Sequence, residues 1–155
     1  MKKMIIIGLT ALWLSACSDL QGSNGRTDEN FPKISRPYNS EQAIQNGDVV
    51  NVHGQLSNMD KWHQFLKNIE ANKADKVRIT QYTIEGDPIF YELIYNGESI
   101  HYTFDNSMDA YGSNQGRPST TCKGMGTKKN EQGNEYYILK DCDNETGKTF
   151  WFHKK

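Results

Sequence analysis

The sequence predicts an α+β fold, in which a short helix and one long amphipathic helix pack on a mostly antiparallel β-sheet with one disulfide. Three observations lead to this prediction. Short runs rich in β-branched and aromatic residues follow one another from residue 76 onward. Asn96-Gly97 lies between two of these runs and is a strong hairpin signal. Before them, residues 58–72 carry apolar side chains at helical spacing, namely Met59, Trp62, Phe65, Leu66 and Ile69.

Each element has its own local signals. The first helix is expected over residues 40–46, with Ser40 as its cap and Asn46-Gly47 as its end. Ser57 and Asp60 fit a capping box for the long helix, which is expected to cover one sheet face. Strands are expected over 48–54, 76–85, 89–95, 99–105, 135–140 and 148–153, with a further strand compatible with 119–123 and a polar loop over 106–118.

The composition is typical of one folded domain. The chain has 155 residues, and its eight tyrosines and three tryptophans argue against a disordered chain. The formal net charge is −1 and no large cluster of Lys and Arg stands out, so we expect no nucleic-acid partner.

Residues 1–16 have the layout of a secretory signal peptide. Lys2 and Lys3 precede an apolar run of about 11 residues, whereas a membrane-spanning helix needs roughly 20. Leu14-Ser15-Ala16-Cys17 resembles a bacterial lipobox. The resemblance implies cleavage between Ala16 and Cys17 and a diacylglyceryl group on the Cys17 thiol, which would anchor the chain in a membrane. The alternative is an ordinary secreted protein with an incidental cysteine.

The predicted domain boundary lies near residue 38. Residues 17–38 combine the lipidated cysteine with a Gly- and Pro-containing segment that is typical of a flexible tether. A single α+β domain is expected over residues 39–155. The alternative for the second half of the tether is an ordered arm, with Phe31 and Ile34 docked on the domain.

The remaining cysteines, Cys122 and Cys142, are expected to form a disulfide. An exported compartment permits the bond, and the two residues flank one predicted strand region. A closed loop of about 20 residues would add roughly 3 kcal/mol of stability. The alternative is a metal site, but no Cys-x-x-Cys or His-x-x-x-His spacing supplies further ligands, so we expect no metal.

No catalytic motif appears in the sequence, and we expect neither catalytic residues nor a cofactor. The four histidines fall on four different predicted elements. Glu85-Gly86-Asp87-Pro88 has two carboxylates but is better explained as a turn. Asp141, Asp143 and Asn144 lack the remaining ligands of a calcium loop. Neither a Gly-x-Ser-x-Gly elbow nor a phosphate-binding loop is present.

Surplus aromatic residues suggest a binding surface. The strand over 89–95 is apolar on both faces, and so is Phe150-Trp151-Phe152. One face should pack on the long helix. The other is either covered by loops or exposed to a partner, in which case Tyr91, Tyr95 and Trp151 are the candidate surface.

A family resemblance is carried by five segments: NGDVVNVHG (46–54), DKVRITQYTIEGDPIFYELIYNG (75–97), HYTFDNSMD (101–109), TTCKG (120–124) and KDCDN (140–144). These segments resemble a family of small lipoproteins from bacilli and related Gram-positive bacteria, catalogued as a domain of unknown function. The resemblance covers roughly residues 38–153. It implies a location on the outer face of a Gram-positive plasma membrane and brings no established catalytic residues.

Together these observations predict a lipid-anchored extracytoplasmic module that binds a partner at the cell envelope and has no catalysis of its own. An envelope protein is the expected partner, bound through the open sheet face or the 106–118 loop. One alternative is an inhibitor of an envelope or secreted enzyme, which rests on analogy between folds. The other is a hydrolase whose site is not visible in the sequence.

Overall fold

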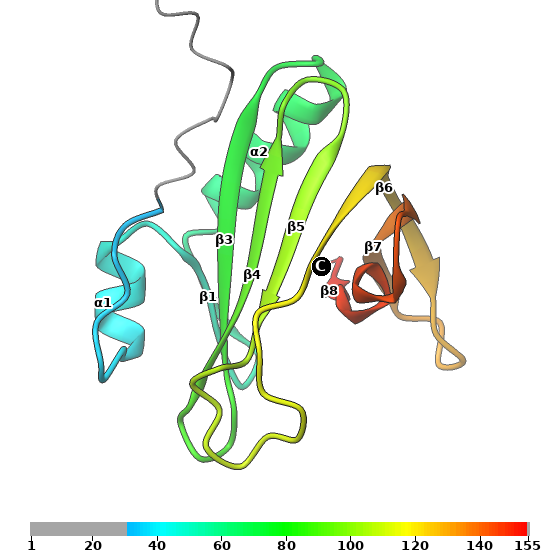
Figure 1. Ribbon diagram of the computed structural model, residues 1–155. Coiled ribbons are helices and arrows are strands. Elements are labelled where there is room, and N and C mark those ends of the chain that lie inside the picture. The colour runs from blue at the N-terminus through cyan, green and yellow to red at the C-terminus, as the bar shows by residue number, and fades with distance from the viewer. Residues whose placement is uncertain (1–30, 155) are drawn as a thin grey trace, which may run out of the picture.

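The computed structural model describes residues 31–154 and shows one curled β-sheet (Figure 1). Its strands are ordered β2-β1-β3-β4-β5-β6-β7-β8; β1 and β3 are parallel, and all other neighbours are antiparallel. The elements are α1 (Ser40–Gln45), β1 (Val49–Val52), β2 (Gln55–Ser57), α2 (Met59–Glu70), β3 (Asp75–Tyr82), β4 (Pro88–Tyr95), β5 (Ile100–Asp105), β6 (Ser119–Lys129), β7 (Glu135–Cys142), the 3-10 helix η1 (Glu145–Thr149) and β8 (Phe152–His153).

The predicted α+β fold, with a long amphipathic helix packed on a sheet, is wrong. The structure is mostly β-sheet, with one helix of 12 residues and a second of 6. Within α2 only Trp62 and Phe65 are buried. The long β6–β7 hairpin curls away from the plane of β3–β5 (Figure 1), so the sheet and the C-terminal segment supply most of their own core. The prediction fails because the curl of the sheet comes from twist that accumulates over all eight strands, which local periodicity does not report.

The sheet has an inner and an outer face, which alternate along each strand. The inner face carries Val49 and Ile79 in one row across β1 and β3. The outer face carries the next residues along, Val50 and Thr80, which pair with each other and continue to Phe90 on β4. Burial on both faces explains why these strands lack a simple alternation of apolar and polar residues.

Trp62 of α2 lies at the centre of the inner core. Its ring centroid is 5.2 Å from that of Tyr137 and 5.0 Å from that of Phe152, both in edge-to-face geometry. Phe150 adds a third ring at 6.2 Å. The C-terminal residues therefore close the inner face together with α2.

A buried ionic network covers part of the outer face. Arg78 Nε donates to Asp48 Oδ1 at 2.8 Å, and Asp48 Oδ2 accepts from the hydroxyls of Tyr38 and Thr80 at 2.8 and 2.7 Å. Arg78 also donates to the Pro32 carbonyl oxygen at 2.9 Å. The network thus fastens the segment before α1 to the sheet.

The segment over residues 31–38 is an ordered arm on the outer face. The Arg78 guanidinium lies 5.4 Å from the centroid of the Phe31 ring. Ile34 packs on the outer-face cluster that contains Phe90. Residues of this segment therefore contact the sheet before residue 39, as the ordered-arm alternative drawn from the sequence expects.

Both helices begin differently from the prediction. Asn39, rather than Ser40, caps α1 and forms a capping box with Gln42. The cap of α2 is Asn58, whose side chain makes no capping bond, so the predicted box of Ser57 and Asp60 is wrong. The Asn58 side chain instead donates to the carbonyl oxygens of Ile44 and Asp48, both at 2.9 Å.

The bounds of the hairpin and of two strands also differ from the prediction. The hairpin at Asn96-Gly97 is present, but its turn spans residues 96–99, and the Asn96 side chain accepts the backbone N–H groups of Glu98 and Ser99. The strand compatible with 119–123 extends to Lys129 as β6. The predicted strand over 148–153 is mostly wrong, because η1 occupies its beginning and β8 only its end.

The predicted disulfide between Cys122 and Cys142 is present and joins paired positions of β6 and β7. The 3-10 helix η1 packs directly against it. A Cβ atom added at Gly147 would lie 2.2 Å from Cys142 Sγ. Only glycine therefore allows η1 to approach the disulfide this closely.

Candidate ligand cleft

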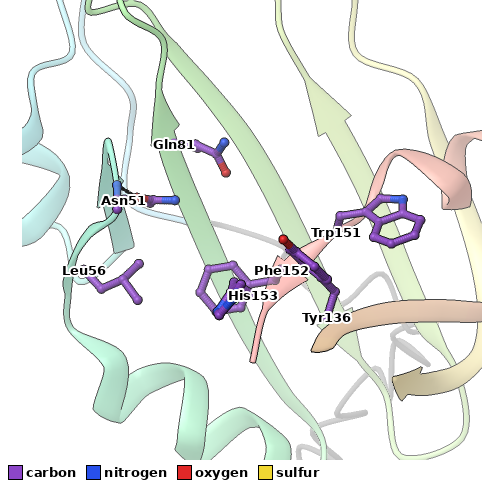
Figure 2. A pocket seen from close by; sticks show the side chains of 8 residues that line it. Asn51, Leu56, Gln81, Tyr136, Trp151, Phe152 and His153 are labelled. Carbon is purple, nitrogen blue, oxygen red and sulfur yellow. Dashed lines mark hydrogen bonds between the residues drawn. The ribbon is translucent and has the colours of Figure 1, made fainter. Parts of the chain in front are cut away.

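A cleft of about 290 Å³ lies where the two ends of the curled sheet approach each other. We call it the seam cleft. Residues from the β2-β1-β3 end face residues from β7 and β8 across it (Figure 2). Its lining residues are Asn51, Gly54, Leu56, Gln81, Tyr136, Trp151, Phe152 and His153.

One wall of the seam cleft is a row of three residues across β2, β1 and β3. Leu56 pairs with Asn51, and Asn51 pairs in turn with Gln81. Side chains alternate along a strand, so Asn51 and Gln81 share the inner face with Val49 and Ile79 two residues earlier. The inner face thus changes from apolar to amide-bearing where the core ends.

The two amides of this wall retain hydrogen-bonding capacity. Asn51 Oδ1 accepts the backbone N–H of Gly54 at 2.8 Å, which fixes the orientation of the side chain. Within residues 31–154, no hydrogen bond involves the Asn51 Nδ2 group or the Gln81 side chain. Figure 2 shows both amides directed toward the β7–β8 side of the cleft.

The opposite wall is aromatic. Tyr136 and His153 are paired residues of β7 and β8, and their rings meet edge-to-face at 5.0 Å. The Trp151 ring lies 5.8 Å from Tyr136, and Trp151 Nε1 donates to the Lys148 carbonyl oxygen at 3.0 Å. Trp151 is 43% exposed, so this wall offers aromatic surface to a ligand.

None of the described residues that line the cleft is an Asp, Glu, Lys or Arg. A cation lies beside the aromatic wall, because Lys128 Nζ is 5.4 Å from the centroid of the Trp151 ring. His153 Nδ1 is buried and has no hydrogen-bond partner among the described residues. The seam cleft is therefore suited to a neutral ligand.

A larger cavity of about 390 Å³ lies beside the arm, but Asp48, Asp75 and Arg78 in its lining already have partners within the chain. Asp48 and Arg78 are paired with each other. Asp75 accepts the Asn68 amide and the Lys76 backbone N–H, both at 2.8 Å. These contacts hold the arm and α2 on the sheet, so we assign this cavity a structural role.

The candidate surface predicted from the sequence is divided between the core and the cleft. Tyr95 is only 6% exposed, and its hydroxyl donates to the Gly97 carbonyl oxygen at 2.8 Å. Tyr91 packs against the inner core, where burial raises the pKa of its phenol. Of the three residues, only Trp151 is exposed and lines the seam cleft.

The other sequence candidates have local explanations or lie elsewhere. Ala16 and Cys17, the predicted cleavage and lipidation residues, lie outside the described residues. Asp87 accepts the Ala110 N–H at 2.9 Å and so joins two loops. The Asn144 side chain caps η1 by accepting the Thr146 N–H. Across residues 31–154, no group of three or more metal-binding side chains is gathered.

Sequence reasoning misses Asn51, Gln81 and Tyr136 as site residues. A weak signal does exist for the two amides, because each lies two residues beyond an apolar residue on the same face of its strand. Their proximity to Tyr136 depends on the curl of the sheet. Strand patterns do not reveal that proximity.

The fold and the cleft define a small curled-sheet domain with a candidate ligand site at the seam of its sheet. The family model described as Domain of unknown function (DUF4362) matches residues 46–137, more than half of the chain. The chain belongs to this family, which confirms that the sequence resembles a domain of unknown function. No curated protein and no solved structure matches it.

The family match covers only part of the seam cleft. Asn51 and Gln81, on the amide wall, and Tyr136 fall within it, whereas Trp151 and His153 lie beyond it.

Among the described helices, none is both long and apolar enough to cross a membrane.

Proposed function

We propose that this protein is a lipid-anchored, extracytoplasmic binding module that holds a neutral ligand in the seam cleft at the cell envelope. The observation that carries the proposal is the cleft itself, in which one wall has amide groups with hydrogen-bonding capacity left among the described residues and the other has exposed aromatic surface. The leader and the lipobox-like segment ending at Cys17 support the envelope location.

The chemistry of the lining favours binding over catalysis. Among the described residues that line the cleft, His153 and Tyr136 are the titratable side chains, and the lining includes no carboxylate or cysteine. Hydrolases commonly use a carboxyl group, or a histidine oriented by a carboxylate, for general acid–base catalysis. The proposal therefore includes no catalytic step.

The anchor is tested by replacing Cys17 with Ser. Because the thiol would form the thioether to diacylglycerol, Cys17→Ser should move the protein from the membrane fraction to the soluble fraction or block its processing. Cell fractionation and intact mass of the protein measure this, with Ser18→Ala as the matched control. An unchanged, membrane-bound mature Cys17→Ser protein would contradict lipid anchoring.

The binding role is tested in living cells by photocross-linking. A photoreactive amino acid at Gln81 should give an adduct with a distinct mass, because that side chain faces the open cleft. The same group at Glu131, an exposed residue outside the cleft lining, is the control. Equal adducts at both positions, or none at Gln81, would overturn the proposed binding function of the cleft.

A further inference from the structure

We infer that the seam cleft binds one neutral sugar ring of a glycan chain. The inference rests on the proposed function, because it names the ligand class of the same cleft. It follows from the chemistry of the two walls, the charge around them and the size of the space between them.

The aromatic wall fits the flat face of a sugar ring. The C–H groups on that face carry a small positive charge, whereas the faces of aromatic rings are negative. Trp151 is exposed, and its ring lies 5.8 Å from that of Tyr136, which in turn lies 5.0 Å from the His153 ring. This wall thus offers an aromatic surface that can pack against the C–H face of a sugar ring, whose edge is polar.

The amide wall fits the rim of the same ring. A sugar carries hydroxyl groups around its edge, each of which donates and accepts hydrogen bonds. Asn and Gln amides also do both. Asn51 Nδ2 and the Gln81 amide make no hydrogen bond within residues 31–154, and Asn51 is held in place by the Gly54 N–H. An entirely apolar ligand would leave these groups unpaired.

The charge near the cleft disfavours a cationic ligand. Aromatic clusters can also bind quaternary ammonium groups through their ring faces. Here Lys128 Nζ already lies 5.4 Å from the centroid of the Trp151 ring, so a second cation would meet repulsion. None of the described lining residues carries a carboxylate that would offset that repulsion.

The edges of the sheet disfavour an extended peptide. Peptides often bind by adding a strand to an open sheet edge. The two edge strands that bound the seam have only three and two residues, β2 and β8, and offer a short ladder. At about 290 Å³, the cleft lies at the lower end of ligand sites, which fits a single ring of a longer chain.

The test is isothermal titration of the full chain in a sugar-free detergent. The probes are a β-1,4-linked tetramer of N-acetylglucosamine, maltotetraose, choline and a neutral tetrapeptide. We expect saturable binding of at least one tetrasaccharide. Trp151→Ala and Gln81→Leu, which alter opposite walls, should each weaken it about tenfold. Tyr111→Ala, which removes an 80% exposed ring outside the cleft lining, is the control and should leave it unchanged.

Thermal unfolding of each variant shows whether it is folded. Trp151→Ala and Gln81→Leu test the two walls of the cleft independently. The inference is overturned if neither tetrasaccharide binds, or if sugar binding survives both cleft variants. Binding of choline or the peptide in place of sugar overturns the sugar inference alone. The proposed function fails separately, through the absence of photocross-linked adducts at Gln81.

Discussion

Asp48 and Arg78 show how charged residues can occupy the interior of this sheet. Both side chains are 2% exposed. Removing such charges from water is costly unless each is paired and fully hydrogen-bonded. Asp48 meets this condition through Arg78, Tyr38 and Thr80, so the network holds the arm and β3 in a single arrangement.

At this scale we predict that Asp48→Ala strongly destabilises the protein. The substitution leaves the Arg78 charge without its closest partner in a buried site, a change that typically costs about 3–5 kcal/mol of unfolding free energy. Urea unfolding followed by circular dichroism measures this. Glu131→Ala removes an exposed carboxylate and is the control. If Asp48→Ala lowered the unfolding free energy by less than about 0.5 kcal/mol, as substitutions at ordinary surface sites do, the proposed role of the network would be contradicted.

Among the elements, η1 shows how the disulfide shapes the C-terminal segment. It packs over the Cys122–Cys142 bond through Gly147, and the chain then leads through Phe150 into the inner core. Its position also sets the start of the segment that carries Trp151 into the seam cleft. A displacement of η1 should therefore affect both stability and the cleft.

We predict that Gly147→Ala lowers the unfolding free energy by about 1–3 kcal/mol, as expected for overpacking. The new methyl group would lie 2.2 Å from Cys142 Sγ, and the disulfide cannot move aside easily. Gly124→Ala is a matched control on β6, because a Cβ there meets no atom within 4 Å. Equal thermal unfolding temperatures for the two variants would contradict this packing.

For the whole molecule, buried tyrosines on both faces link stability to pH. Burial raises the pKa of Tyr82 on the outer face and of Tyr102 on the inner face well above the ordinary value. Desolvation is also the main cause of the raised pKa of Tyr38. In the unfolded chain, these phenols would ionise near pH 10.

We therefore predict that the protein loses stability in alkali. A folded-state pKa above the unfolded value contributes stability that is complete below pH about 10 and is lost as pH rises through the folded pKa. Urea midpoints measured from pH 8 to pH 12 should fall above pH about 10. Tyr82→Phe should reduce this slope, whereas Tyr111→Phe, at an exposed residue, should not. A flat profile would contradict the prediction.

Local signals in the sequence predicted many single elements. The periodicity around Trp62 and Phe65 located α2, and Asn96-Gly97 located the hairpin between β4 and β5. The disulfide between Cys122 and Cys142 was also predictable, because the two cysteines flank one strand. These features depend on short stretches of chain or on a small set of partners.

The candidate site was far less predictable. Trp151 was singled out as an aromatic residue, but its neighbours Asn51 and Gln81 are about 100 and 70 positions away in the sequence. Tyr95, from the same predicted surface, is buried instead. Exposure and proximity both depend on the face that each strand presents after the sheet has paired.

The sequence by itself determined where this chain forms α2, most of its strands, the β4–β5 hairpin and its disulfide. Periodicity, turn chemistry and cysteine count act over short distances or few partners. Only the tertiary structure decided the parallel pairing of β1 with β3, the curl of the sheet and the seam cleft. These features require contacts between strands distant in sequence, whose pairing and twist no local pattern specifies.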